Sequence, residues 1–445
     1  MRRRKRWPWV LVGILLGCPC LLTGVGLVVL KIGIANAGNT LPKELARARQ
    51  AGLATEPADL RAELAIPASQ NAAGDYRTAI AACKEEWPQM SPDMSLPHFL
   101  ALKATPAEER TVRNLLDKTR RTIDLFEKAS AKPAVDWGRP WEQGPDVLFP
   151  EQASMKSGVK LICAKAILAA KRGHTAEAFR LLSIGFRIGK HAGDDPTLIG
   201  LLVQIAVDGM CTSASCNVLN LRHDPASLTR AREMFESLPP IEDLGRAVGG
   251  EIVMERIGVQ HLDRYAQQTG MGGSATYQAF PLNVLARDAS FRRAVEAKAV
   301  HNQVLIYLAT LKGKTWKQTQ PAWKAAMASI DADKSLENII AQDLVLDGIQ
   351  DAPARATAYR RMLWAGIAVL SVYEKTHRLP AKLPDMGDNG LDPFSDKPLG
   401  YKLTADGFKV YSIDNDEVDD GGLSRAEDTT GKSNTHDIDR VFKVR

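Results

Sequence analysis

The residues best suited to chemistry are carboxylates crowded into one short stretch, YSIDNDEVDDGG, at residues 411–422. Its acidic members are Asp414, Asp416, Glu417, Asp419 and Asp420. Neighbouring carboxylates repel one another unless a cation binds between them or they extend into water. Carboxylate and carbonyl oxygens are the ligands that Ca²⁺ prefers, and the closing Gly pair lets the backbone curl so that carbonyls can join them. The stretch predicts a calcium site, with a solvated acidic loop as the alternative.

The elements that must position this stretch are a helix and a small antiparallel sheet. An amphipathic pattern predicts a helix over residues 354–375, and HRLPAKLPD ends it. The segments LGYKL and FKVYSI alternate apolar and polar residues, and TADG between them is typical of a hairpin turn. IDRVFKV is a candidate final strand. The acidic stretch therefore follows directly after the second strand.

Four segments occur here in the same order as in the globular end of the major pseudopilin of type II secretion systems, which this region resembles. They are SVYEKTHRLP, DPFSDKPLGY, YSIDNDEVDDGG and HDI. The family has a helix ending in a Tyr-containing turn, then DPWGNPYxY, a strand, SxGxDGxxGG, an acidic loop and DADI. The resemblance covers residues 355–440, under a quarter of the chain.

In that family the acidic loop holds a calcium ion, so the resemblance implies a structural Ca²⁺ here. The ligands that it implies, matched by motif position, are Ser412, Asp416, Asp419, Asp420 and Asp437. The family's tight-turn Gly is missing after Asp416. The prepilin peptidase motif is also absent, so assembly into a pilus is not expected. The whole layout is similar to large uncharacterised exported helical proteins of planctomycete-type bacteria, a resemblance that implies no activity.

The N-terminus predicts a membrane anchor. Residues 1–37 carry six Lys and Arg and no acid, and an apolar run extends from Trp7 to Leu30. About 20 apolar residues span a bilayer as a helix, and the basic start stays in the cytoplasm. We expect a single-pass protein of the inner (cytoplasmic) membrane with its body outside the cytoplasm. Cleavage before Gly38 and lipidation at Cys18 are alternatives that also export the body.

Charge outside the anchor excludes a nucleic-acid-binding body. The chain has 58 Lys and Arg and 52 Asp and Glu, so the excess of six equals the charge of residues 1–37. A body with no net charge lacks the basic face that nucleic-acid recognition needs. The acids gather at the other end, with 14 acidic against 6 basic residues from Asp385 to Arg440.

The fold class expected is mainly α. Residues 41–376 show successive amphipathic helices, and the pattern around RGHT resembles a tetratricopeptide-type hairpin without a regular repeat. We divide the chain into a cytoplasmic stub and anchor (1–37), a helical domain (38–350) and a small α+β module (351–445). A Trp/Pro/Gly-rich loop at 131–150 is a possible sub-boundary.

Cysteine usage gives no metal or redox motif, because no CxxC occurs. The cysteines of the body are expected to be small buried apolar residues on helices. In an oxidising compartment they could also pair, and the sequence leaves that pairing open. They are Cys83, Cys163, Cys211 and Cys216.

Searches for catalytic patterns find no HExxH, GxSxG, Walker A or GxGxxG sequence. Glu251 and Glu255 share a helix face that we expect to be solvated, and His261 does not lie on it. Asp136 and Glu142 flank two Trp residues in an arrangement found in carbohydrate sites, but a loop that caps helices is the favoured interpretation.

These observations favour a membrane-anchored extracytoplasmic protein of interaction or scaffold type, which binds a protein partner through helical hairpins. One alternative is an accessory component of a type II secretion-like or envelope machine. The other is an enzyme whose site has no recognisable motif.

Overall fold

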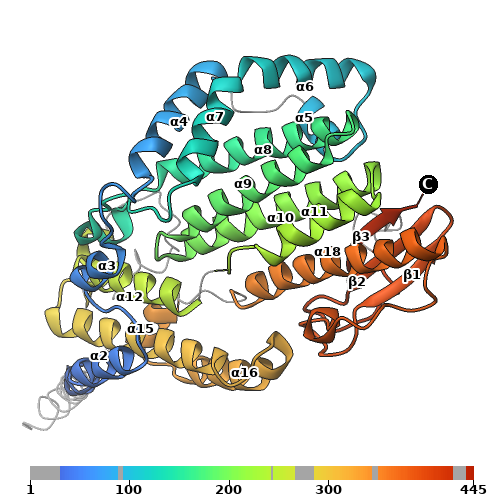
Figure 1. The fold of residues 1–445 in the computed structure, drawn as a ribbon. Helices are drawn as coiled ribbons and strands as arrows, with labels where there is room; N and C mark the ends of the chain where they lie inside the picture. The colour runs from blue at the N-terminus through green and yellow to red at the C-terminus, as the bar shows by residue number, and fades with distance from the viewer. Residues whose placement is uncertain are drawn as a thin grey trace, which may run out of the picture.

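The computed structural model describes six parts of the chain, and the apolar run predicted to anchor it lies outside them. The described residues are 31–88, 94–241, 244–265, 285–342, 349–423 and 437–444. They form a mainly helical protein with a small three-stranded antiparallel sheet near the C-terminus (Figure 1). The predicted fold class is confirmed at this level.

The N-terminal half is entirely helical in its regular elements. Residues 31–38 are helical. The helices that follow are α2 (Leu41–Gln50), α3 (Pro57–Leu64), α4 (Ala73–Glu86), α5 (Ser95–Leu100), α6 (Pro106–Lys118), α7 (Arg120–Ser130), η1 (Trp141–Asp146), α8 (Pro150–Lys171), α9 (Thr175–Gly193), α10 (Leu198–Leu221) and α11 (Pro225–Glu236).

The second half adds helices and then the sheet. Its helices are α12 (Leu244–Gln260), α13 (Leu262–Tyr265), α15 (Ala289–Thr310), α16 (Trp316–Ala332), α17 (Leu336–Gln342), α18 (Asp351–Thr376) and η3 (Gly387–Gly390). Its strands are β1 (Gly400–Thr404), β2 (Gly407–Ser412) and β3 (Ile438–Lys443).

Local sequence signals determine several helix ends. Thr105 accepts a hydrogen bond from the Glu108 backbone, Glu108 bonds back to Thr105, and Pro106 is the first residue of α6. Gly173, with φ of +85°, follows the end of α8. The next helix begins at Thr175, with His174 rather than Thr175 in the capping position.

The main core lies between layered helices. In Figure 1, α8, α9, α10 and α11 lie side by side, α4 and α7 cover one side of the layer, and α18 lies along the other. Small residues permit the close approach, since a Cβ added at Gly185 would come within 2.6 Å of the Cys211 sulfur. Cys83, Cys163, Cys211 and Cys216 are free and buried in this layer, as expected.

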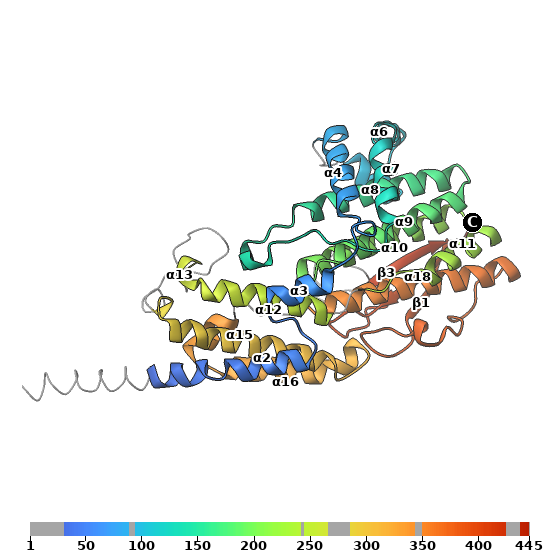
Figure 2. The same cartoon turned by 60° about the vertical axis from the view of Figure 1, so that its left-hand side comes forward.

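A second group of helices packs beside this layer. α2, α12, α15 and α16 run close together at the blue and yellow end of the molecule (Figure 2). Their apolar residues form separate clusters, one of which includes Leu41, Ile252 and Val304. α12 packs against α15, η1 and α10, so it links the two groups.

The C-terminal sheet has the order β1-β2-β3. Phe408 of β2 is paired with Phe442 of β3, and their rings stack with centroids 5.0 Å apart. The Asn220 side chain of α10 covers the outer edge of β3: its amide donates to the Val441 carbonyl at 3.0 Å and its oxygen accepts from the Lys443 N–H at 2.8 Å. The predicted hairpin turn between β1 and β2 is confirmed.

The core is continuous across the domain boundary expected near residue 350. Met362 and Leu363 of α18 and Phe408 and Phe442 of the sheet belong to the same buried cluster as Phe126 and Phe179. The C-terminal module therefore packs directly on α10 and α11.

Among the described residues, α10 has the length and apolar composition of a membrane-crossing helix. In this structure 61% of its most apolar window is buried inside the protein, where it packs against α8, α9 and α18. By length and composition alone, such a helix is weak evidence of a membrane span.

Candidate functional site

Asp437 closes the acidic loop that leaves β2. It lies just before β3 and only 2% of its surface is exposed. Its Oδ2 accepts the Gly422 N–H at 2.7 Å, and its own N–H donates to the Leu423 carbonyl at 3.0 Å. Gly421 and Gly422 both adopt positive φ, +67° and +80°, so the Gly pair does supply the curled backbone expected of it.

Two buried carboxylate oxygens in this loop, Asp437 Oδ1 and Asp420 Oδ2, have no hydrogen-bond partner among the described residues. The pKa of Asp437 is raised to about 6, chiefly by burial and also by the nearby negative charges of Asp419 and Asp420, while two backbone hydrogen bonds oppose the rise. Asp419 also shares a hydrogen bond with Tyr411, whose pKa rises to about 12 through burial and then through Asp419. Asp419 and Asp420 therefore lie close enough to Asp437 for their negative charges to act on its carboxylate.

The other two predicted ligands make hydrogen bonds of their own. The Ser412 hydroxyl donates to Asp392 Oδ1 at 2.8 Å. Ser412 is paired with Ile438 of β3, so its side chain points to the opposite face of the sheet from those of Tyr411 and Asp437. Asp416 Oδ1 accepts the Val418 N–H at 3.0 Å in an exposed turn.

Lys409 was not expected at this site. Its ammonium donates to the Gly422 carbonyl at 2.8 Å and lies 3.0 Å from Asp439 Oδ2. The Lys409 ammonium therefore already neutralises part of the negative charge around the loop. In the part of the chain that the structure describes, no group of three or more His, Cys, Asp or Glu residues has an arrangement that could hold a metal ion.

Asp392, also missed by the sequence analysis, organises the start of the loop. It is 1% exposed and accepts hydrogen bonds from the Ser412 hydroxyl and from the backbone N–H groups of Ile413 and Phe394. It belongs to DPFSDKPLGY, the second segment of the family resemblance, and that match and the Asp-Pro pair are the signals that could have suggested it.

The remaining acidic residues of the stretch fasten it to helices. Asp414 accepts from Arg355 of α18 at 2.7 Å, and Glu417 pairs with Lys317 of α16. The Asn415 amide donates to Asp351 at the start of α18 at 2.6 Å. The stretch thus divides into a first half that docks on α16 and α18 and a second half whose carboxylates gather at Asp437.

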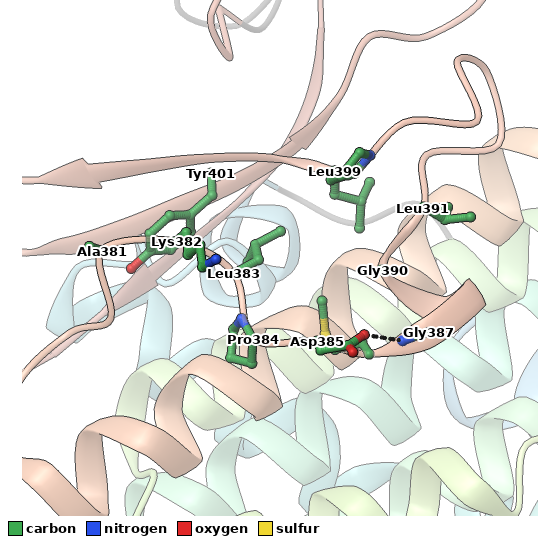
Figure 3. Close-up of a pocket in the computed structure, with 12 residues that line it drawn as sticks. Ala381, Lys382, Leu383, Pro384, Asp385, Gly387, Gly390, Leu391, Leu399 and Tyr401 are labelled. Atoms are coloured by element: carbon green, nitrogen blue, oxygen red, sulfur yellow. Dashed lines mark hydrogen bonds between the residues drawn. The ribbon is translucent and has the colours of Figure 1, made fainter.

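A cavity of about 530 Å³ lies beside β1, between the chain at 381–391 and the residues that lead into the strand (Figure 3). Tyr401 and Leu383 form part of its wall, and the Tyr401 hydroxyl donates to the Pro380 carbonyl at 3.0 Å. Asp385, its one carboxylate among the described lining residues, accepts the Gly387 N–H at 3.0 Å. The lining is mainly apolar and presents no nucleophile beside a base.

The expectation of a solvated face at Glu251 and Glu255 is wrong for Glu255. Glu255 is 9% exposed, its Oε1 accepts from Gln303 of α15 at 2.8 Å, and its Oε2 has no partner. Glu251 accepts the Leu198 N–H at 2.8 Å, and burial raises its pKa to about 7. α12 is covered by neighbours on more than one side, so its acids face protein rather than water.

The tryptophan loop has the geometry of a structural loop. Trp141 is 1% exposed and packs with Leu60 and Val253. Glu142 pairs with Arg61, and hydrogen bonds hold its pKa below the usual range. A general acid needs the opposite shift, so these contacts do not favour a glycosidase-type site here.

No family model, curated protein or solved structure shows significant similarity to this chain.

Proposed function

We propose that this protein is a membrane-anchored, extracytoplasmic interaction or scaffold protein whose C-terminal module is stiffened by a structural Ca²⁺. In this proposal the helical layers present the surface for a protein partner. The calcium ion locks the loop between β2 and β3, and the module is pseudopilin-like.

The observation that carries the calcium assignment is the pair of buried, unpartnered oxygens on Asp420 and Asp437 beside Asp419. A buried carboxylate oxygen without a donor is costly, because the desolvation penalty is not repaid. Ca²⁺ accepts carboxylate oxygens in irregular arrangements, which suits three acids contributed by a loop and a strand end. Ser412 and Asp416, the other two ligands that the resemblance implies, each make a hydrogen bond of their own, to Asp392 and from Val418 respectively.

The anchor assignment rests on the basic start and apolar run of residues 1–30, which lie outside the described residues. Residues 31–38 are helical and precede α2 at the blue end of the molecule (Figure 2); Ile34 is buried against Phe291, whereas Ile32 is 55% exposed. A helix whose start exposes an apolar side chain suits a connection to a membrane span.

The second candidate is an accessory component of a type II secretion-like machine. It is favoured by one observation, the order of a long helix, the DPF turn and a three-stranded sheet. Affinity purification of the full chain from membranes separates the candidates: recovery of secretion-system subunits supports the second, and recovery of other envelope proteins supports the first.

The calcium proposal is tested by thermal unfolding of the full chain in detergent with Ca²⁺, with Mg²⁺ and with excess chelator. A ligand at about 100 times its Kd adds about 2.7 kcal/mol, which for a chain of this length raises Tm by about 3 °C. Ca²⁺ alone should give this rise, and Asp420→Asn or Asp437→Asn should remove it. Asp406→Asn changes an exposed acid at the far end of the sheet and should leave the calcium response intact. Equal melting in Ca²⁺ and chelator would eliminate the ion from the proposal.

A further inference from the structure

A second cavity, of about 390 Å³, lies where the helical body meets the C-terminal module, at the starts of α12, α16 and α18. Its walls combine apolar side chains with hydroxyl groups and two basic residues. The described lining residues are Ile241, Leu244, Thr310, Leu311, Gly313, Lys314, Thr315, Trp316, Thr319, Gln350, Pro353, Ala354, Thr357, Arg361 and Pro393. None of these is Asp or Glu; Glu242 and Asp243, which follow Ile241, lie outside the described residues.

Arg361 is the unusual member of this lining. It is half-buried, and its one side-chain hydrogen bond among the described residues goes to the Leu391 carbonyl, at 2.8 Å. The other arginines of α18 have carboxylate partners: Arg355 pairs with Asp414 and Arg360 with Asp208. A guanidinium carries five N–H donors, so Arg361 keeps donor capacity that an anion could use.

Among the described residues, the Arg361 guanidinium forms no ion pair with a carboxylate. Desolvation lowers the pKa of Arg361, and the attraction of Asp388, Asp392 and Asp396 does not outweigh it. Asp392 holds Ser412, and Asp396 accepts from Gln318 through its Oδ2 at 3.0 Å, whereas Asp396 Oδ1 has no hydrogen-bond partner among the described residues. A bound anion would restore the missing stabilisation of a half-buried positive charge.

The helix ends around the cavity add to its positive potential. Thr315 caps α16 and Gln350 precedes α18, and both residues line the cavity. The N-terminal ends of helices attract anions through their dipoles and their free N–H groups. Lys314 lies exposed beside the same opening.

Besides positive charge, the lining of the cavity offers a ligand a hydrogen-bond acceptor and an apolar wall. Gln350 Oε1 is buried without a partner in the described part of the chain, so it can accept a hydrogen bond from a ligand hydroxyl or amine. Trp316, Leu244 and Pro353 offer an apolar wall of the kind that covers the body of a small organic ligand.

We propose that this cavity binds a small organic oxyanion, a carboxylate or a phosphate ester, with its anionic group on Arg361 and Lys314 and its apolar body against Trp316 and Leu244. The site joins the helical body to the C-terminal module, and it is separate from the calcium loop and independent of the proposed scaffold role.

Isothermal titration of the full chain in detergent tests this with phenyl phosphate, benzoate, inorganic phosphate and benzyl alcohol. Phenyl phosphate and benzoate should bind in the micromolar to millimolar range, and the tighter of the two identifies the anionic group. Inorganic phosphate should bind more weakly because it lacks the apolar body, and benzyl alcohol should not bind. No heat from either organic anion, or equal binding of benzyl alcohol, would overturn the proposal.

Substitutions of the basic residues test whether the organic anions bind in this cavity. Arg361→Gln should weaken binding of the organic anions roughly tenfold or more, and Arg361→Lys should weaken it less, since a charge is kept but the fork is lost. Lys314→Gln should weaken it severalfold, whereas Lys312→Gln, an exposed change of the same charge two residues away, should have no effect. Because Lys314 is exposed, its variant remains informative if Arg361→Gln fails to fold. Equal affinity in the Lys314 and Lys312 variants, with Arg361→Gln also unchanged, would place the binding elsewhere.

Discussion

The Asp208 carboxylate of α10 accepts a hydrogen bond from Arg360 of α18 at 2.8 Å, across 152 residues of chain. Asp208 is 2% exposed, and Arg360 also donates to the Pro239 carbonyl at 2.8 Å. Burial raises the pKa of Asp208, and the attraction of Arg360 opposes that rise. This pair holds the C-terminal helix onto the central helix of the body.

Removing one partner of this pair should be strongly destabilising. Asp208→Ala leaves the Arg360 guanidinium without its counter-ion in a largely buried setting, and such losses cost about 3–5 kcal/mol. Chemical denaturation of the full chain should show this loss in the free energy of unfolding. Asp117→Ala breaks an exposed pair with Arg120 and should cost at most about 0.5 kcal/mol. Equal effects of the two changes would contradict the docking role of Asp208.

Two helical glycines should respond to alanine with opposite signs. A Cβ on Gly366 of α18 would lie 2.0 Å from the Phe442 ring, whereas one on Gly209 of α10 would meet nothing within 4 Å. Gly366→Ala should destabilise by about 1–3 kcal/mol through overpacking. Gly209→Ala should stabilise by about 0.5–1 kcal/mol, because Ala has the higher helix propensity. Urea denaturation of the two variants measures both, and a stabilising Gly366→Ala would show that α18 and β3 are not in close contact.

The free energy of unfolding should fall as pH rises from the ordinary pKa of Glu251 to its raised value in the folded chain. Its pKa is raised from 4.5 to about 7 by burial, so the folded chain binds this proton more tightly than the unfolded chain. The contribution to stability is therefore complete below about pH 4.5 and is lost as pH approaches 7, at a cost of about 3 kcal/mol. Glu255, whose pKa burial raises in the same direction, adds to this loss.

The measurement is the difference in unfolding free energy between the wild-type chain and Glu251→Gln at pH 5 and at pH 8. The variant should be the more stable at pH 8 and should show a smaller decline between the two values. Glu236→Gln, at an exposed position on α11, should leave the decline unchanged. If the decline in unfolding free energy is as large in Glu251→Gln as in the wild-type chain, other titratable groups cause it.

The body cysteines should be inert in the native state. Burial raises the pKa of Cys83 and Cys216 to about 11 and also raises that of Cys211, and thiols react as thiolates. In a chain carrying Cys18→Ser and Cys20→Ser, Ellman's reagent should label these thiols, and the buried Cys163, only after unfolding. A disulfide-linked peptide in the non-reduced protein, detected by mass spectrometry, would contradict the free state of these residues.

Helix ends and turns, which depend on neighbouring residues, were the parts of the fold that the sequence could predict. Thr105, Pro106 and Glu108 act within one turn of helix, and the turn between β1 and β2 depends on adjacent residues. Such signals do not require knowledge of what lies across the core. The same holds for the Gly421–Gly422 curl, where positive φ is a property of the residues themselves.

Contacts between distant segments were not predictable in this way. The spacing of Glu251 and Glu255 on one helix face does not reveal that α15 and the turn before α10 cover that face. Motif position likewise placed Ser412 with the ligands, but strand alternation turns its hydroxyl toward Asp392. Only the three-dimensional pairing of β2 with β3 decides which acids meet Asp437.

The Asn220 amide, which covers β3, has a consequence for how the chain folds. It joins residues 221 positions apart, so the segment that completes the sheet is synthesised long after α10. Until residues 438–443 emerge, the apolar sides of α10 and α18 lack their cover. That apolar surface therefore remains accessible to chaperones or to a translocation channel. A premature stop before residue 438 would therefore leave that surface permanently uncovered and mark the product for proteolysis.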